Sequence, residues 1–552
     1  MKKIILISIP ALLSIAVYSC RNENDSANPK VDALFEQYNT KTGPGCALAV
    51  IENDKVVYKK GYGLANLEYD IPITTSTVFD IASVSKQFAG LAISTLVQDG
   101  KISLDDDVRK YLSDFPDFGK RITIRHLINH TSGLRDWPET LNVAGWRWDD
   151  VFSFEDILRM VKNQKELDFE PGAQFSYSNT GYNMLAAIVA KVSGKSFREW
   201  TDENIFSPLH MNSSHFLDDY RKIVKNMAYS YKRSGNDFVK SPTGLTAYGS
   251  SSLFTSVDDL CLWVINFDKQ IAAKNPVYQR MLEEGVLNDG KKTKYAFGLG
   301  LDVQGTLKTV SHNGGWAGYR TAIVNFPDEK ISVILLSNAS DVDSDGKALD
   351  VAKLFLNGKF KEEETKGPKA KDLPTIKVNT AFAQKCTGTY QLGTGWYVTI
   401  TLEGDTLKTQ ANNEAKFSMA AKSDSVYWVD AYNASMTFVK DAKGEVNSLR
   451  YKWIESAKKV TLLAIDRGEF ARYAGTYHSE ELATEYKVDV LKDKLMMHHM
   501  RLGDIELQPD PITTDQFTSS VGTVKFIGNG QKKFAGFRLS GGRIKNLLFD
   551  KK

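Results

Sequence analysis

Apolar residues in the first two thirds of the chain form two kinds of run. Short runs such as CALAVI, TAIVNF and ISVILLS have the length and composition of strands, and polar residues such as Asn53 and Asp54 mark a turn between strands. Longer runs such as FAGLAISTLVQDG and MLAAIVAKVSG carry apolar residues at helical spacing and end at a glycine, where a helix C-cap is expected. This pattern predicts an α/β or α+β sandwich over residues 31–360, with an antiparallel sheet flanked by helices.

The last third of the chain has a different pattern. A polar, charged segment that contains proline predicts a linker at residues 361–378. Beyond it the chain reads as short strands and turns, and it repeats, because the Gly-Thr-Tyr at 388–390 recurs at 475–477. Each copy has the length of a small antiparallel β-barrel of about six to eight strands. We therefore expect two barrel domains, at 379–466 and 467–552.

Residues 1–20 have the pattern of a targeting segment. Two lysines precede the apolar run IILISIPALLSIAV, which is shorter than a typical membrane span, and polar residues 21–30 follow as a leash. The end of the segment resembles a bacterial lipoprotein signal. That resemblance implies a lipid anchor at Cys20 and an exported protein held on a membrane of the cell envelope, facing the periplasm or the cell surface. Tyr18 departs from the usual small or aliphatic residue at its place, so plain secretion is the alternative.

Composition limits the classes of partner. The 552 residues are enough for two to four domains, and 70 basic against 67 acidic residues give a net charge of +3. Because nucleic-acid-binding proteins usually show a strong basic excess, we expect no nucleic-acid partner. The four cysteines show no metal-ligand spacing, and we expect neither a metal nor another cofactor. The sequence leaves the oligomeric state open.

Candidate chemistry begins at the Ser-Val-Ser-Lys of residues 83–86. Ser83 and Lys86 lie three apart at the start of a predicted helix, so they share a face and the amine can reach the hydroxyl. A serine becomes a nucleophile when a base takes its proton, and burial or nearby cations can lower the pKa of a lysine enough for that task. One alternative is a helix-capping serine with a solvated lysine. Ser85 is the rival nucleophile, but it is adjacent to the lysine, and adjacent residues do not face each other on a helix.

Two later segments add candidates. Tyr177 and Asn179 lie two apart in an extended loop, so their side chains point the same way and can face a cleft. The alternative is a core tyrosine and an asparagine that caps the next helix. His312 precedes Gly314 and Gly315 within a run of strands, where glycines let a substrate approach the backbone and leave N–H groups to bind an oxyanion. The alternative there is a glycine turn beside a surface histidine.

In this order SVSK, YSN and HNGG, with TSGL, PGAQFSYSN, FSPLHM and FGLGL around them, resemble the serine β-lactamase-like superfamily. The similar group includes class C β-lactamases, D-alanyl-D-alanine carboxypeptidases, D-aminopeptidases and family VIII esterases. The resemblance covers about residues 31–360 and implies a β-lactamase-like sandwich there. The repeated tail is similar to the two C-terminal barrels of D-aminopeptidase-like members.

The resemblance also implies catalytic roles. Ser83 would form an acyl-enzyme, and Lys86 and Tyr177 would share the acid–base work in an order that the sequence leaves open. His312 completes the implied catalytic set. No metal enters this chemistry.

Substrate binding follows from the same resemblance. Asn179 would hydrogen-bond the substrate and the lysine, and Gly314 and Gly315 would border the oxyanion hole. Class C β-lactamases carry Lys-Thr-Gly where this chain has His312-Asn313-Gly314, and a histidine is only partly charged near pH 7. We therefore expect weak or absent β-lactamase activity and a serine hydrolase acting on D-amino-acid peptides, amides or esters. The alternatives are a carboxylesterase of the same fold and a non-catalytic envelope binding protein.

Overall fold

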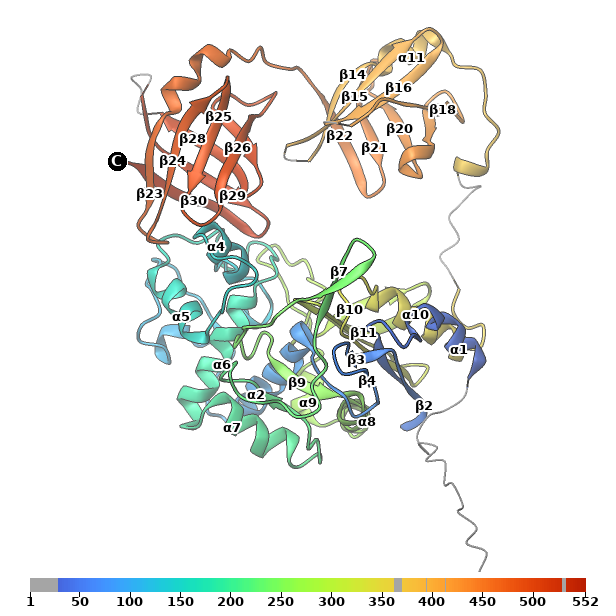
Figure 1. The fold of residues 1–552 in the computed structure, drawn as a ribbon, viewed down its shortest axis with the longest axis vertical. Coiled ribbons are helices and arrows are strands. Elements are labelled where there is room, and N and C mark those ends of the chain that lie inside the picture. The colour runs from blue at the N-terminus through green and yellow to red at the C-terminus, as the bar shows by residue number, and fades with distance from the viewer. Residues whose placement is uncertain (1–27, 362–369, 394, 413, 529–532) are drawn as a thin grey trace, which may run out of the picture.

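The computed structural model describes residues 28–361, 370–393, 395–412, 414–528 and 533–552 (Figure 1). The predicted targeting segment with Cys20, most of the leash and residues 362–369 of the predicted linker lie outside the described residues. Within the described ranges, no helix combines the length and the apolar character needed to cross a membrane.

The N-terminal domain is built on a six-stranded antiparallel sheet in the order β10-β11-β12-β13-β1-β2. β1 is the run CALAVI, and it reads as continuously apolar because both of its faces are covered. Ala47, Ala49 and Ile51 join the larger apolar core, whereas Leu48 and Val50 face the smaller one. The strands of this sheet are β1 Cys46–Glu52, β2 Lys55–Tyr62, β10 Gly300–Gln304, β11 Leu307–Trp316, β12 Tyr319–Phe326 and β13 Ile331–Ser337.

Helices cover both faces of the sheet (Figure 1). Buried apolar side chains of α1 and α10 line the smaller core, and those of α2 to α8 line the larger one, apart from Val143 at the end of α4. The predicted helix that ends at Gly194 is confirmed, since Gly194 adopts a left-handed C-cap. The helices are α1 Pro29–Leu34, α2 Lys86–Gln98, α3 Ile124–Ile128, α4 Trp137–Val143, α5 Phe154–Asn163, α6 Asn179–Ser193, α7 Phe197–Thr201, α8 Val257–Ala272, α9 Pro276–Arg280 and α10 Ser344–Phe355.

Short strands complete the domain around the sheet. They form a three-stranded sheet in the order β5-β9-β6 and two separate hairpins. Their bounds are β3 Leu64–Asn66, β4 Ile71–Pro72, β5 Val78–Asp80, β6 His215–Phe216, β7 Tyr231–Ser234, β8 Asp237–Lys240 and β9 Leu253–Ser256. The predicted sandwich of an antiparallel sheet flanked by helices is therefore confirmed.

The tail folds into two antiparallel β units. After α11 Thr380–Cys386, the first is a nearly closed nine-stranded sheet, and the second is a closed eight-stranded barrel. The first unit contains β14 Gly388–Gly393, β15 Trp396–Glu403, β16 Thr406–Ala411, β17 Phe417–Ser418, β18 Ala420–Ala421, β19 Val426–Val429, β20 Ala434–Lys440, β21 Val446–Tyr451 and β22 Ile454–Val460. The second contains β23 Gly475–Ser479, β24 Thr484–Leu491, β25 Lys494–His499, β26 Gly503–Pro509, β27 Gln516–Ser519, β28 Gly522–Gly528, β29 Phe534–Gly541 and β30 Ile544–Lys551.

The second barrel is seated over α4 and α5 of the N-terminal domain (Figure 1). Its core includes Val143 from the end of α4, and Tyr486 Oη donates to the Val143 carbonyl oxygen at 2.8 Å. Arg135 is buried in the interface, where it pairs with Asp168 of its own domain and with Glu481 of the barrel. The contact between the two domains is thus both apolar and ionic.

Candidate active site

The candidate nucleophile lies on a strained turn between β5 and α2. Ser83 belongs to a 3-10 turn, Ala82–Ser85, that precedes α2 rather than to the first turn of that helix. Ala82 adopts φ +46°, a left-handed conformation that residues other than glycine disfavour. Asp80 supports this turn, because its Oδ1 accepts a hydrogen bond from Ala82 N at 2.8 Å. The turn holds the serine hydroxyl at a fixed place in front of the helix.

Lys86 lies directly behind this hydroxyl and is fully buried, which excludes the solvated lysine. Its Nζ lies 3.1 Å from Ser83 Oγ, 2.7 Å from Asn179 Oδ1 and 2.8 Å from the Ser250 carbonyl oxygen. Burial lowers the pKa of Lys86 well below its ordinary value, Asp136 opposes this change, and Arg543 adds to it. The amine is therefore driven toward its neutral form, as a base requires.

Those three contacts also fit the valence of a neutral amine. The Asn179 and Ser250 oxygens can only accept, so they take the two N–H groups of an uncharged lysine. The lone pair is then left for the hydrogen of the Ser83 hydroxyl. The geometry is that of a base poised over its nucleophile.

Asn179 opens α6, but it does not cap it, because Ser178 is the N-cap and accepts from Gly181 N. The backbone N and Nδ2 of Asn179 instead donate to the two oxygens of Asp136, at 2.6 Å and 3.1 Å. Asp136 is 1% exposed and orients the amide so that its oxygen faces Lys86. No motif in the sequence marks this aspartate.

Tyr177 lies beside the same pair. Lys86 Nζ lies 4.8 Å from the centre of the Tyr177 ring. Burial raises the pKa of the Tyr177 hydroxyl, and the neighbouring Ser83 partly offsets that rise, but the two hydroxyls are not in hydrogen-bonding geometry. The Tyr177 hydroxyl therefore lies beside the Ser83–Lys86 pair without a hydrogen bond to either residue.

His312 lies behind Tyr177, with 6.2 Å between the two ring centres, and it is buried rather than on the surface. Its Nδ1 faces the Asn313 carbonyl oxygen at 2.6 Å, and its Nε2 lies 2.9 Å from Tyr295 Oη. Because a carbonyl oxygen only accepts, Nδ1 carries the proton and Nε2 accepts from the tyrosine. Burial lowers the pKa of His312 to about 3, so the ring is neutral at neutral pH.

Gly314 and Gly315 form the opposite wall on β11. A Cβ on Gly314 would lie 2.4 Å from the Ile81 carbonyl oxygen and 3.0 Å from Ser83 N, so the strand touches the nucleophile turn only because this residue is glycine. Gly315 is exposed and lines the cleft. The register pairs β11 with β10 only as far as Ser311, so this end of the strand has no partner in the sheet on that side.

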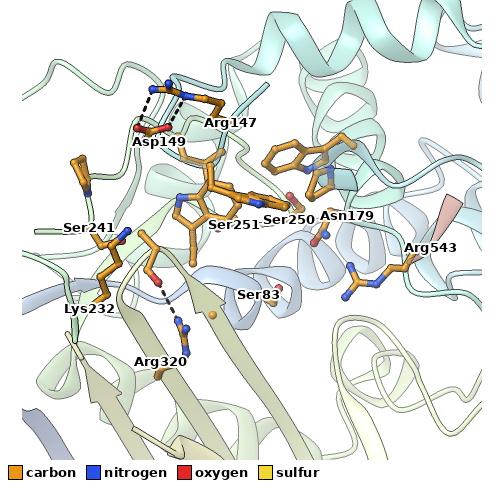
Figure 2. Close-up of a pocket in the computed structure, with 18 of the residues that line it drawn as sticks. Ser83, Arg147, Asp149, Asn179, Lys232, Ser241, Ser250, Ser251, Arg320 and Arg543 are labelled. Carbon is orange, nitrogen blue, oxygen red and sulfur yellow. Dashed lines mark hydrogen bonds and ion pairs between the residues drawn. The ribbon is translucent and has the colours of Figure 1, made fainter. Parts of the chain in front are cut away.

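Ser83, Tyr177, Asn179 and Gly315 border one cleft of about 910 Å³, whereas Lys86 and His312 are not part of its lining. Figure 2 shows Ser83 between Arg320 and Arg543. The cleft is cationic, since its lining includes Arg147, Lys232 and both of these arginines but one acidic residue, Asp149, which pairs with Arg147. Three tryptophans form its apolar wall: Trp137, Trp148 and Trp316.

A smaller recess of about 460 Å³ extends from Ser83 on the other side. Arg320 and Arg543 border it as well, together with the acidic residues Asp343 and Asp345. Arg320 and Arg543 thus place positive charge on both recesses beside Ser83. The acidic residues of the smaller recess lie at the start of α10.

Arg543 comes from the second barrel, more than 350 residues after the helix that it contacts. Its Nη1 donates to Asp136 Oδ2 at 2.5 Å, and its guanidinium carbon lies 5.0 Å from the centre of the Tyr177 ring. The sequence carries no signal for this placement, because the residue follows two glycines in an ordinary hairpin turn. The site thus combines predicted residues from the N-terminal domain with an arginine from the tail.

Comparisons with known proteins find relatives of this chain. The chain is 28% identical over 433 residues to Penicillin-binding protein 4* of Bacillus subtilis, covering 74% of this chain and 93% of that protein. It is also 28% identical over 327 residues to a D-aminopeptidase of Brucella ovis, covering 59% of this chain and 61% of that protein, so the match spans under two thirds of that relative.

Solved structures show the same fold. An octameric penicillin-binding protein homologue from Pyrococcus abyssi superposes with a TM-score of 0.55 at 22% identity, over 86% of this chain and 98% of that one. A D-amino acid amidase from Ochrobactrum anthropi gives 0.51 at 20% identity, over 60% of this chain and all of the other. The model of the Beta-lactamase family matches residues 31–357, more than half of the sequence. The chain therefore belongs to the Beta-lactamase family, within the serine β-lactamase-like superfamily.

Proposed function

We propose that this protein is a serine hydrolase that cleaves amide or peptide bonds through an acyl-enzyme on Ser83. The observation that carries the proposal is the buried Lys86, whose amine lies 3.1 Å from Ser83 Oγ with both N–H groups occupied by acceptors. The neutral amine takes the hydroxyl proton, and Oγ attacks the carbonyl carbon of the substrate. Backbone N–H groups of Ser83 and Gly315 bind the resulting oxyanion.

Collapse of this intermediate breaks the bond between the acyl carbon and its leaving group. The proton held by Lys86 passes to the leaving amine, directly or through the Tyr177 hydroxyl beside it. Water then hydrolyses the ester on Ser83 by the same steps in reverse, which restores the serine and releases the acid.

The finer proposal is that the substrate contains D-amino acids and belongs to the cell envelope. Relatives named as a penicillin-binding protein and as D-aminopeptidases support the first part at 28% identity. The neutral His312, which stands where class C β-lactamases carry a lysine, supports weak β-lactamase activity. A carboxylesterase with the same acyl-enzyme is the second candidate, and the assay below separates the two.

The test is intact-protein mass spectrometry after brief incubation with four acyl donors: a penicillin, a D-Ala-D-Ala peptide, a D-amino-acid amide and a short-chain ester. We expect a mass increment on the wild type and none on Ser83→Ala. Ser85→Ala is the matched control, because Ser85 is fully buried and its Oγ accepts a hydrogen bond from Leu253 N at 3.3 Å. The Ser85→Ala protein should still be acylated on Ser83. Labelling of Ser83→Ala, or no labelling and no product with any donor, would refute the proposal.

We also propose that the protein is exported and anchored to an envelope membrane by a lipid on Cys20. The supporting observation is the sequence pattern of residues 1–20 alone. Fractionation of cells that express the wild type and Cys20→Ser is the test. We expect the wild type with membranes and the variant in the soluble exported fraction, and an identical distribution would contradict the anchor.

A further inference from the structure

The turn between β29 and β30 of the second barrel reaches into the active site. Gly541 and Gly542 precede Arg543 in this turn, and a Cβ on Gly542 would come within 3.2 Å of the Glu139 side chain on α4. The turn is held from the other side at Lys545, whose N donates to Asp168 Oδ1 at 2.9 Å and whose carbonyl oxygen accepts from Arg135 at 2.5 Å. The barrel therefore fixes the arginine in place.

Arg543 contacts the carboxylate of Asp136, which also holds Asn179, the residue that contacts Lys86. Asp136 Oδ1 accepts from the backbone of Asn179, and Oδ2 accepts both from its amide and from Arg543. The amide oxygen of the same asparagine lies 2.7 Å from Lys86 Nζ. One chain of contacts thus runs from the barrel through Asp136 and Asn179 to the base.

This chain of contacts has an electrostatic consequence. An unpaired carboxylate near a lysine raises the pKa of its amine, because negative charge stabilises the ammonium form. Such a carboxylate would therefore reduce the fraction of neutral amine that can act as a base. Arg543 supplies the compensating positive charge at 2.5 Å from that carboxylate. The Arg543 side chain is 42% exposed, so water screens its charge in part, but its partner Asp136 is only 1% exposed.

We propose that Arg543 is a positioning residue through which the second barrel completes the active site, by pairing with Asp136 so that Lys86 remains a free amine and Asn179 keeps its orientation. The inference rests on the proposed acyl-enzyme function. It gives the barrel a part in maintaining the catalytic base, through Asp136, rather than a purely structural part.

The other groups around Lys86 do not supply this charge. The rings of Tyr177 and Tyr182 lie 4.8 Å and 5.7 Å from its Nζ and carry no net charge. Burial holds the pKa values of His130 and His312 well below their ordinary range, so both are neutral in the working pH range. Among the residues that the structure describes, the charged groups that act on the lysine are therefore Asp136 and Arg543.

Asp136 has one further acidic neighbour. Burial and the charge of Asp136 raise the pKa of Glu139 to about 7, while Arg543, at 4.0 Å, opposes that change. Loss of the arginine would make Glu139 take up a proton more readily. The proton on Glu139 would cancel the negative charge of that side chain, so the Asp136 carboxylate would remain as the negative group that acts on Lys86.

The experiment measures the second-order rate constant for acylation of Ser83 against pH in the full-length protein, using the donor that labels the wild type. For Arg543→Gln we expect the acidic limb to move upward by about one pH unit, with the rate largely recovered at high pH. Arg543→Lys should restore most of the wild-type profile. Arg538→Gln is the matched control, because Arg538 also joins the barrel to the N-terminal domain, through an ion pair with Glu166, and it should leave the profile unchanged.

Three results would overturn the inference. An unchanged profile in a folded Arg543→Gln protein would show that the arginine does not act on the base. A uniform loss at every pH would show that it contacts the substrate instead. The third result concerns the Asp136→Asn background. If Arg543→Gln shifts the pH profile there as much as it does in the wild type, the arginine does not act through Asp136. A wild type that no donor acylates would instead refute the proposed function itself.

Discussion

Replacing Gly314 by alanine tests how closely β11 must approach the nucleophile turn. The added Cβ would lie 2.4 Å from the Ile81 carbonyl oxygen and 2.5 Å from Thr321 Oγ1. Since carbon–oxygen contacts are ordinarily about 3.3 Å or longer, the strand would have to withdraw by about 0.9 Å. The carbonyl cannot turn aside without cost, because it accepts a hydrogen bond from Thr321 Oγ1 at 2.9 Å.

A withdrawal of this size separates the Gly315 N–H from the oxyanion position beside Ser83. Loss of one such donor typically lowers the rate by about 10²- to 10³-fold. Overpacking of this kind also costs about 1–3 kcal/mol of stability. We therefore expect Gly314→Ala to fold with a lower unfolding midpoint and to acylate about 10²- to 10³-fold more slowly than the wild type.

The assay is time-resolved mass spectrometry of the acyl-enzyme, with circular dichroism to establish that the variant is folded. Gly300→Ala on the neighbouring strand β10 is the matched control, because a Cβ there would meet nothing closer than the Ser311 carbonyl oxygen at 3.3 Å, which is at the lower end of ordinary contact distances. It should retain the wild-type rate within a few-fold. A folded Gly314→Ala protein that acylates at the wild-type rate, or equal losses in the two variants, would refute the steric reasoning.

Three further predictions concern the domain interface, the nucleophile turn and the cleft. Arg135→Met leaves the buried carboxylates of Asp168 and Glu481 without their partner and should lower the free energy of unfolding by about 3–5 kcal/mol. Arg538→Ala removes an exposed ion pair and should lower it by under about 1 kcal/mol. Similar losses for the two variants in denaturant unfolding would contradict this contrast. Burial raises the pKa of Asp80 to about 7, so its contribution to stability is full below its unfolded pKa of about 3.9 and is lost as the pH rises through about 7. Asp80→Asn should therefore become more stable relative to wild type at about pH 8 than at about pH 5, and a parallel pH dependence would count against it. Lys232→Glu should lower kcat/KM for substrates with a free carboxylate more than for their neutral amides, and equal effects would show that the charge of the cleft does not select substrates.

The fold could be predicted where a pattern is local. The strand CALAVI is continuously apolar because both faces of β1 are covered, and the helix before Gly194 ends where glycine permits a left-handed residue. Asn53 and Asp54 both adopt positive φ in the turn between β1 and β2, as their residue types suggest. The detailed closure of the two tail units could not be foreseen, because strand pairing across a barrel depends on contacts distant in sequence.

The site divides in the same way. Ser83, Lys86, Tyr177 and Asn179 stand in recognisable motifs, and the structure brings them together around one cleft. Asp136 could not be found, because it follows a turn as an ordinary helix-start aspartate would, and only the folded chain shows that it orients the asparagine. His312 shows the opposite limit, since its motif is visible but its burial and its bond to Tyr295 are not.

The three tryptophans of the cleft give the protein a built-in optical signal. The chain has nine tryptophans, and Trp137, Trp148 and Trp316 line the space above Ser83. Trp148 is 56% exposed, so a ligand seated on it would exchange water for an apolar contact and shift its emission toward shorter wavelengths. Occupancy of the cleft can therefore be followed in unlabelled protein, even for a ligand that is never cleaved.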